Sequence, residues 1–300
     1  MPTYQQLVQN FKPQKALHLK DELAKKKPKL DGLFAIYEKY DGWDTTVIYC
    51  DGKFHAPLSS ANNVIASLEW MAEQLNTKFQ HRLPFEFIIK AEAYRYDTPF
   101  KVLNGLLNRR VGNYVLQDAL LMVHDIVPLN KVIRLDERMR LVDHFVESCA
   151  SLGFVRKAEV LGISEYNEKL WDRFFYKVLE NAGEGIIAKR TTGVYEIGKR
   201  NSDVLKKKLE MTVDVLATEL RDGVGDKGNP SLTLICKRKN GAIVPVVIAK
   251  HSLIDKFLND PKCVIGKVVT VRAMEEFENG TLRQPVFACE RPDKAVDDYE

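Results

Sequence analysis

A lysine is followed two residues later by an aspartate and then by a glycine in the segment Lys39-Tyr40-Asp41-Gly42. An amine attacks only after losing its proton, and burial beside other cations or near a metal lowers a lysine pKa enough to allow this. The pattern is therefore typical of a lysine that forms a covalent intermediate. The same residues also suit a hairpin turn with an exposed lysine, and the tetrapeptide alone does not separate the two readings.

Five further segments place charged or polar residues beside apolar runs. They are Glu92 in IIKAEAY, His124-Asp125 in LLMVHDIV, Glu184 to Lys189 in EGIIAK, Lys206 with Lys208, and Arg291-Pro292-Asp293-Lys294. Four of the five have an ordinary explanation when taken one at a time. These explanations are an exposed strand acid, a core histidine, a surface lysine cluster and a polar tail. Whether these segments form one functional site depends on the secondary-structure elements that position them.

Hydrophobic periodicity predicts where these elements lie. A basic helix is expected over 4–27, ending at Lys25, Lys26 and Lys27 before Pro28. Strands are expected over 33–37, 45–50, 85–96, 114–129 and 183–190, and helices over 63–74, 134–151 and 165–181. A basic segment, 204–217, runs into a further strand. Most of the chemistry-bearing residues therefore lie on strands or at their ends.

The pattern of expected secondary structure changes after residue 217. Short strand-like runs at 232–236, 243–248, 264–271 and 285–289 surround one helical segment at 252–259. Several short strands with one helix in fewer than 100 residues indicate a small barrel such as the OB-fold. We place the domain division so that residues 1–210 form one domain and 211–300 the other.

Composition limits the possible classes of protein. The 300 residues are 45% hydrophobic and 29% charged, which excludes a wholly disordered, collagen-like or coiled-coil chain. The net charge of 45 − 41 = +4 is too small to demonstrate a polyanionic partner. The five cysteines are scattered, without a CxxC pair or zinc spacing, which favours a reducing compartment. With neither a signal peptide nor an apolar run of ~18 residues, we expect a cytoplasmic or nucleoid-associated protein without a membrane partner.

In their order along the chain, these segments resemble the covalent nucleotidyltransferase superfamily, which includes ATP-dependent DNA ligases, RNA ligases and mRNA capping enzymes. Lys39, Asp41 and Gly42 match its K-x-D-G pattern, and the other five segments match further family blocks over about residues 33–294. The last block, R-x-D-K, follows LRQPVF at 282–287, which is similar to the L-R-x-P-x-F stretch of DNA ligases. The resemblance therefore favours a small, phage-type or virus-encoded DNA ligase.

The resemblance implies an α/β (α+β), ATP-grasp-like nucleotidyltransferase domain followed by an all-β OB-fold barrel. It implies that Lys39 attacks the α-phosphate of ATP to form lysyl-AMP, with Asp41 orienting the amine. AMP then passes to the 5′-phosphate at a nick, and the 3′-hydroxyl seals the strand. Contacts to ATP or AMP would come from Glu38, Lys39, Glu92, His124, Glu184, Lys189, Lys206 and Lys208.

Metal and phosphate contacts follow from the same resemblance. Glu92 and Glu184 would hold Mg²⁺, or alternatively Mn²⁺, because carboxylates are the oxygen ligands that such hard cations prefer. His124 would stack on adenine. Arg291, Asp293 and Lys294 would close over the pyrophosphate, which requires a domain motion.

The sequence departs from the family pattern at several positions. The family arginine two residues after the K-x-D-G glycine is Asp44 here, and no arginine stands in PLSSANN, residues 57–63. The glutamate block reads Lys90-Ala91-Glu92 instead of D-G-E, and the residue two before the lysine, often acidic, is Tyr37. Glu38 is a candidate to replace it in reading adenine. The resemblance is thus to a divergent ligase.

Nicked duplex DNA is the expected partner of a monomeric enzyme, and its backbone would be bound without base reading. Candidate contacts are the basic pairs Arg109-Arg110 and Lys199-Arg200, with Lys25–Lys27 and Lys237–Lys239 as further clusters. Each of these is equally explained as a solvated charged face. Three alternatives stay open: an RNA ligase, a capping enzyme that takes GTP, and a nucleic-acid-binding module without catalysis.

Overall fold

The computed structural model describes the chain apart from residues 1, 81–82, 110–113, 182, 225–229 and 249. It divides into two compact units, Met1–Lys208 and Leu209–Glu300. The predicted division lies two residues further along. None of the helices in the described residues combines the length and apolar character that a membrane span requires.

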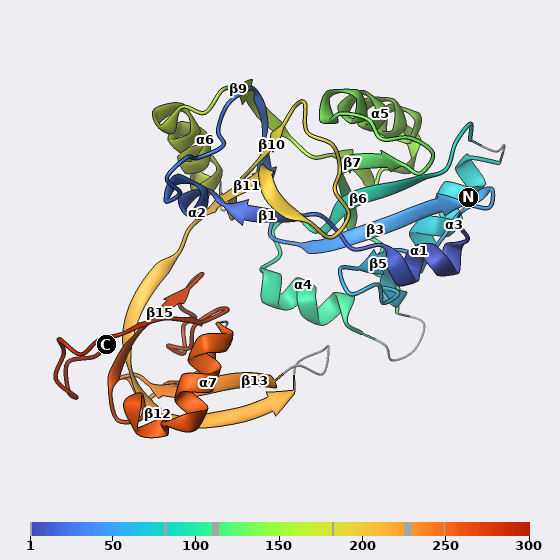
Figure 1. Ribbon diagram of the computed structural model, residues 1–300. Coiled ribbons are helices and arrows are strands. Elements are labelled where there is room, and N and C mark those ends of the chain that lie inside the picture. The colour runs from blue at the N-terminus through green and yellow to red at the C-terminus, as the bar shows by residue number, and fades with distance from the viewer. Residues whose placement is uncertain (1, 81–82, 110–113, 182, 225–229, 249) are drawn as a thin grey trace. The chain divides into compact units, whose positions relative to one another are not determined.

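Two sheets build the first unit (Figure 1). One has the order β1-β11-β10-β2-β9, with bounds Lys15–His18, Arg200–Lys208, Gly185–Arg190, Phe34–Lys39 and Val160–Ser164. The other has the order β4-β3-β6-β7-β8, with bounds Lys53–Phe54, Trp43–Cys50, Phe87–Tyr94, Leu120–Pro128 and Val155–Lys157. A short strand, β5 (Leu58–Ser59), pairs with β3 outside this path.

Helices cover these sheets with their apolar faces. Trp171, Phe175 and Val178 of α6 (Glu168–Glu180) form a core with Phe34 and Ile36 of β2. The sheet that contains β3 and β6 buries a larger core against η1 (Ala66–Leu68), α3 (Glu69–Lys78), α4 (Phe100–Leu107) and α5 (Leu135–Ser148), with η2 (Ala150–Leu152) after α5. Each sheet is therefore anchored by its own apolar core.

The N-terminal segment corrects the prediction of one helix over 4–27. The structure has α1 (Tyr4–Asn10), then strand β1, then α2 (Leu19–Leu23). Pro13 cannot continue a helix because it lacks an N–H. The next residues pair in parallel with β11, Lys15 opposite Arg200 and Leu17 opposite Leu205. A partner almost 190 residues away thus converts a helical pattern into an edge strand.

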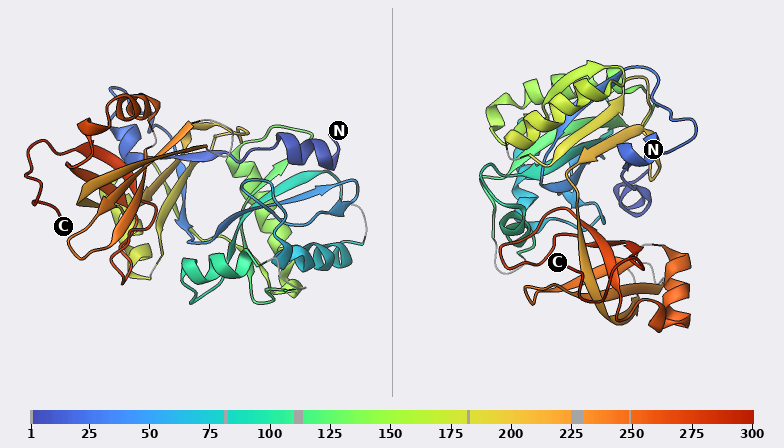
Figure 2. Two further views of the ribbon diagram at one scale, coloured as in Figure 1. Left: turned by 90° about the horizontal axis from the view of Figure 1, so that it is seen from below. Right: turned by 90° about the vertical axis from the view of Figure 1, so that its left-hand side faces the viewer.

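The second unit is a closed five-stranded barrel, which confirms the predicted OB-type fold (Figure 2). Its strand order is β12-β13-β14-β16-β15, with bounds Met211–Val224, Pro230–Lys237, Ile243–Ile248, Val286–Glu290 and Val268–Ala273. Helix α7 (His251–Asn259) and the turn η3 (Pro261–Cys263) connect β14 to β15. Ile254 and Phe257 of α7 pack into the barrel core.

The segment 39–42 links the two sheets of the first unit. Lys39 ends β2, which pairs with β10 and β9, whereas Trp43 begins β3, which pairs with β4, β5 and β6. Since β2 and β3 belong to different sheets, the hairpin reading of this tetrapeptide is wrong. The turn instead carries the chain from one sheet to the other.

Candidate active site

Close packing fixes the backbone beside Lys39. A Cβ on Gly42 would lie 2.4 Å from the carbonyl oxygen of Ala93 in β6, so only glycine lets the turn approach that strand. The Lys39 side chain is 22% exposed, and its Nζ donates to Oε2 of Glu184. The lysine is therefore held in place rather than free in solvent.

Strand β10 brings the predicted catalytic residues to one end of the sheet. Gly185 pairs with Lys39 on one side and with Lys208 on the other. Its φ of +147° and a Cβ position only 2.2 Å from the carbonyl oxygen of Lys207 both require glycine. Lys206 lies two residues before Lys208, so both side chains leave the same face of β11.

A cavity of about 400 Å³ lies beside this strand end. Of the predicted ATP-contacting residues, it is lined by Glu38, Lys39, Glu92, His124, Lys189 and Lys206. Asp41, Glu184 and Lys208 are not among its lining residues, although Glu184 contacts Lys39 directly. Its wall also includes Lys15, Tyr37 and Tyr195, which the sequence analysis did not assign to ATP.

Burial and nearby charges shift the pKa values of two cavity residues. Burial, with the nearby charges of Lys208 and Lys39, lowers the pKa of Lys206 to about 8. Burial raises the pKa of Glu92 to about 8; Lys39 opposes this shift, whereas Asp44 and Glu184 add to it. A bound anion would favour charged Lys206, and a bound cation would favour ionised Glu92.

His124 is held by a buried network. Nζ of Lys189 lies 2.9 Å from Nδ1 of His124 and 3.0 Å from its carbonyl oxygen. It also lies 3.6 Å from Oδ2 of Asp125, which in turn binds Nε of Arg138 at 2.7 Å through Oδ1. Burial, reinforced by Lys189, holds the pKa of His124 well below its usual value, so the ring is neutral.

The network also fixes the tautomer of His124. An ammonium group has no lone pair, so Lys189 donates and Nδ1 accepts, which leaves the ring proton on Nε2. Burial, together with Arg138 and despite Asp125, lowers the pKa of Lys189 to about 8. Its ammonium also lies 5.0 Å from the ring centre of Tyr37. These contacts tie Lys189 to His124, and its contact with phosphate stays a prediction.

Asp44, which replaces the family arginine, forms an ion pair with a lysine. Nζ of Lys90 lies 2.5 Å from Oδ1 of Asp44 and 2.9 Å from the hydroxyl of Thr46. Lys90 is only 2% exposed, whereas Asp44 is 38% exposed. Sequence reasoning noted both departures but not their pairing. The alternation of the two strands carried a signal for this pairing. Lys90 lies opposite Thr46, two positions from the Asp44–Glu92 pair, so the side chains of Lys90 and Asp44 leave the same face of the sheet.

The predicted pyrophosphate residues gather around one buried acid in the barrel. Oδ2 of Asp214, in β12, accepts from Arg291 at 2.7 Å and from Lys294 at 2.9 Å. Asp293 accepts from Arg291 at 2.7 Å. The Arg291–Lys294 segment is thus held against its own barrel.

The basic residues that were predicted to contact DNA lie in different environments in the structure. Arg109 lies 4.9 Å from the ring centre of Tyr114 and lines a second hollow with Gly42 and Asp44, while Arg110 lies outside the described residues. Arg200 lines the Lys39 cavity, and the backbone of Lys199 accepts a bond from Lys15. Among the further clusters, Lys25 pairs with Glu22.

One basic cluster is corrected by the structure. Arg238, in the middle of the Lys237–Lys239 cluster, is buried and bound to Glu276 at 2.5 Å and to the carbonyl oxygen of Gly280 at 2.9 Å. The prediction of a basic surface is therefore wrong at that position. Arg238 follows the last residue of β13, and its contacts with Glu276 and Gly280 hold the side chain inside, whereas the flanking Lys237 and Lys239 are exposed.

Comparison with solved structures finds the same fold. A chain named Pmar-Lig_PreS3 gives a TM-score of 0.75 at 19% identity, with 94% of this chain and 68% of that chain covered. A DNA ligase of the Lig E type gives 0.66 at 15% identity, covering 93% and 99%. The ATP-dependent DNA ligase of bacteriophage T7, in complex with ATP, gives 0.54 at 19% identity, covering 93% and 98%.

The sequence comparisons differ in outcome. No curated protein sequence gives a significant match. A family model described as the ATP dependent DNA ligase domain matches residues 13–208, which contain the Lys39 turn, the cavity and strand β11. With this match over more than half of its length, and with the predicted nucleotidyltransferase fold, the chain belongs to the ATP-dependent DNA ligase family.

Proposed function

We propose that this ligase seals nicks in duplex DNA, using Lys39 as the residue that carries AMP. The observation that supports the proposal most strongly is the position of Lys39. Its ammonium contacts Glu184 at the edge of a cavity whose wall includes Lys206 and Arg200. A cation-lined cavity beside a lysine fits a triphosphate whose α-phosphorus is attacked by an amine.

The first step forms a phosphoramidate on Lys39. Its neutral Nζ attacks the α-phosphorus of ATP, an N–P bond forms, the bond to the bridging oxygen breaks, pyrophosphate leaves, and the nitrogen releases one proton to solvent. The ion pair with Glu184 must loosen first, because a protonated amine has no lone pair to donate. Lys206 and Lys208 would then offset the negative charge of the phosphates.

A divalent cation fits the acidic residues at this point. Glu184 contacts Lys39, and the charges of Lys39, Asp44 and Glu184 all act on Glu92. Glu92 and Glu184 supply carboxylate oxygens, the donor type that Mg²⁺ prefers. When bound, Mg²⁺ would neutralise phosphate charge and favour the departure of pyrophosphate. A cation would also replace the ammonium charge that Glu184 loses when Lys39 is deprotonated.

The adenine end of the cavity has an unusual composition. The neutral ring of His124, held by Lys189, stands where the family places an aromatic residue. We assign it to adenine, with Nε2–H as a possible donor to a base acceptor. Glu38 also lines the cavity, and burial, with the charge of Glu159, raises the pKa of its carboxyl.

The remaining steps act on DNA. The oxygen of a 5′-phosphate displaces Lys39 from AMP, and the 3′-hydroxyl across the nick then displaces AMP and closes the phosphodiester bond. We propose that a single chain carries out all three steps. Phosphate contacts from Arg109 and Lys199 would position the duplex without reading its sequence.

Replacing Lys39 by alanine tests the proposal directly. The variant should gain no adenylate when incubated with ATP and Mg²⁺, because the proposal assigns the attacking amine to Lys39, and intact-protein mass spectrometry would show this. Lys207→Ala is the matched control. Lys207 neighbours Lys206 but pairs with Asp172, 27% and 34% exposed, so its loss should leave adenylation within about twofold.

A second assay with the same proteins measures whether the enzyme prefers DNA or RNA as its nicked substrate. Nicked DNA and nicked RNA duplexes of identical sequence are offered to pre-adenylated enzyme, and the DNA nick should be sealed faster. Adenylation of Lys39→Ala at the wild-type level would refute the role of Lys39. Faster sealing of RNA would instead leave the lysine chemistry intact and change the substrate.

A further inference from the structure

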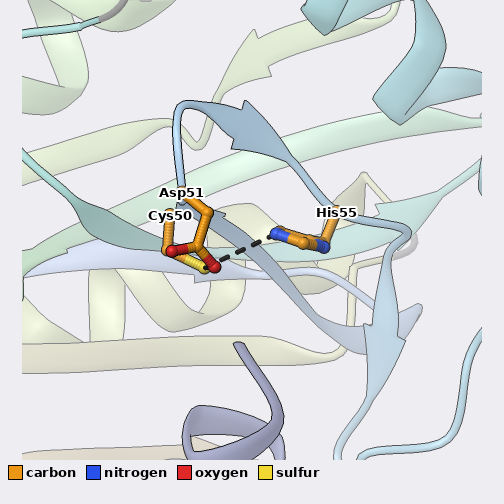
Figure 3. Close-up of side chains that lie close together, drawn as sticks. All are labelled: Cys50, Asp51 and His55. Carbon is orange, nitrogen blue, oxygen red and sulfur yellow. Dashed lines mark hydrogen bonds between the residues drawn. The ribbon is translucent and has the colours of Figure 1, made fainter. Parts of the chain in front are cut away.

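Three different metal-ligand side chains converge on one hairpin (Figure 3). Cys50 ends strand β3, Asp51 lies in the following turn, and His55 follows β4. Their candidate donor atoms all lie within 4.8 Å of one another. The cysteine spacing predicted no zinc site, but that test considered only pairs of cysteines.

The distances suit one shared metal ion. Sγ of Cys50 lies 3.5 Å from Nε2 of His55 and 3.8 Å from Oδ2 of Asp51. Around tetrahedral zinc, with Zn–S of about 2.3 Å and Zn–N or Zn–O of about 2.0–2.1 Å, neighbouring donors are about 3.6 Å apart. A cation could therefore bind with small side-chain shifts.

We propose that Cys50, Asp51 and His55 bind one divalent transition-metal ion, for which Zn²⁺ is the best fit. The set contains one thiolate sulfur, one imidazole nitrogen and one carboxylate oxygen. Mg²⁺ and Ca²⁺ prefer oxygen ligands alone, whereas Zn²⁺ accepts all three donor types. On binding, the thiol proton passes to solvent and a Zn–S bond forms, with water as the fourth ligand.

The surroundings orient the donors and add negative charge. The ring of Tyr4, from α1, stacks on His55 with centroids 3.8 Å apart and planes at 7°. Oε1 of Glu86 accepts from the backbone N–H of Asp51 at 3.1 Å. Oε2 of the same Glu86 is buried and has no hydrogen-bond partner among the described residues. An unpaired carboxylate oxygen is costly, and a nearby cation or its bound water would relieve that cost.

This site is separate from the adenylation chemistry. None of its three residues lines the Lys39 cavity. Seven residue steps along β3, at about 3.4 Å each, place Cys50 about 24 Å from Trp43 beside the Lys39 turn. Cys50 belongs to the core that holds Leu7 and Phe11, in and after α1, against Ile48 and Ile88. Metal binding would therefore stabilise the N-terminal segment on its sheet.

The test uses the full-length protein, stripped with a chelator and free of ATP and Mg²⁺. Calorimetric titration with Zn²⁺ should give one ion per chain, and Co²⁺ should produce a thiolate-to-metal absorption band. Cys50→Ser should abolish the band, and His55→Gln should weaken binding at least tenfold. Cys289→Ser, which alters an exposed cysteine in the barrel, should retain both properties.

Two further measurements keep the proposal open to refutation. Asp51→Asn serves as a second variant in case Cys50→Ser does not fold. It changes one exposed ligand, and circular dichroism checks that it folds without metal. Zn²⁺ should raise the unfolding temperature of the wild type and of Cys289→Ser but not of His55→Gln. Binding below one-tenth of an ion per chain, or equal binding by all variants, would overturn the site. Nick sealing with Mg²⁺ on the same samples separately reports on the proposed function.

Discussion

The pair of Asp44 and Lys90 is asymmetric, and that asymmetry has measurable consequences. Lys90 is nearly fully buried and forms an ion pair with Asp44, whereas Asp44 retains substantial contact with water. A buried ammonium that loses its counter-ion is costly, while a partly exposed carboxylate can be rehydrated. The two single substitutions should therefore differ in cost.

Asp44→Ala should lower the free energy of unfolding by about 2–3 kcal/mol, because it leaves the Lys90 charge buried and unpaired. Lys90→Met should cost about 1 kcal/mol or less, and the double variant should be close to Lys90→Met alone. Urea unfolding measures all three. Asp118→Ala removes the partner of Arg95 at an exposed site and should change stability by less than about 1 kcal/mol. Strictly additive costs would show that the pair is not coupled.

At the scale of elements, strand β10 is the part of the sheet that the site depends on most. It lies between β2 and β11, and at Gly185 it pairs with Lys39 and Lys208 at once. Gly185 also follows Glu184, the partner of Lys39. A backbone shift here would move three of the proposed active-site residues together.

Gly185→Ala should impair both folding and adenylation. The positive φ alone costs about 1–3 kcal/mol, and the added Cβ meets the Lys207 backbone. A misplacement of about 1 Å can cost about 100-fold in rate, so we expect a loss of that order in single-turnover adenylation. Gly105→Ala in α4 is the control, since its Cβ would meet nothing within 4 Å and should stabilise the helix by about 0.5–1 kcal/mol. Equal behaviour of the two variants would exclude this role for Gly185.

Elements with strong local patterns were predictable, and contacts between distant strands were not. The apolar runs of β2, β3, β6 and β10 and the periodicity of α5 and α6 appear in the sequence alone. The pairing of β1 with β11 does not, because no local pattern specifies it. The same limit explains the missed contact of Lys189 with His124, because β10 and β7 lie in different sheets and the contact forms only where these sheets meet. The side chains of Cys50, Asp51 and His55 likewise come close together only in the folded hairpin.

At the scale of the whole molecule, the second unit has an apolar core of its own. The barrel core contains only residues of the second unit, from Val213 to Phe287. The Arg291–Lys294 segment belongs to this unit, whereas Lys39 and its cavity belong to the first. Any role of Arg291 and Lys294 on pyrophosphate therefore depends on how the barrel holds them.

Asp214 provides that support in the structure. Burial alone would raise the pKa of its carboxyl, but hydrogen bonds from Lys294 and Thr270, with the charge of Arg291, hold the pKa below its usual value. Thr270 comes from β15 and Asp214 from β12, so the acid ties the Arg291–Lys294 segment to two barrel strands. We infer that Asp214 is a positioning residue that does not itself touch ATP.

Asp214→Asn should therefore slow self-adenylation while sparing the final step. Hydrogen bonds to charged groups contribute about 1.5–3 kcal/mol, which corresponds to a loss of about 10–100-fold in the adenylation rate. Sealing of a chemically pre-adenylated nick involves no pyrophosphate, so its rate should stay within about twofold. Asp255→Asn, at an exposed position on α7, controls for charge and should leave both steps unchanged. Equal slowing of both steps by Asp214→Asn would indicate general damage to the barrel, because a residue that positions only the pyrophosphate contacts cannot affect a step without pyrophosphate.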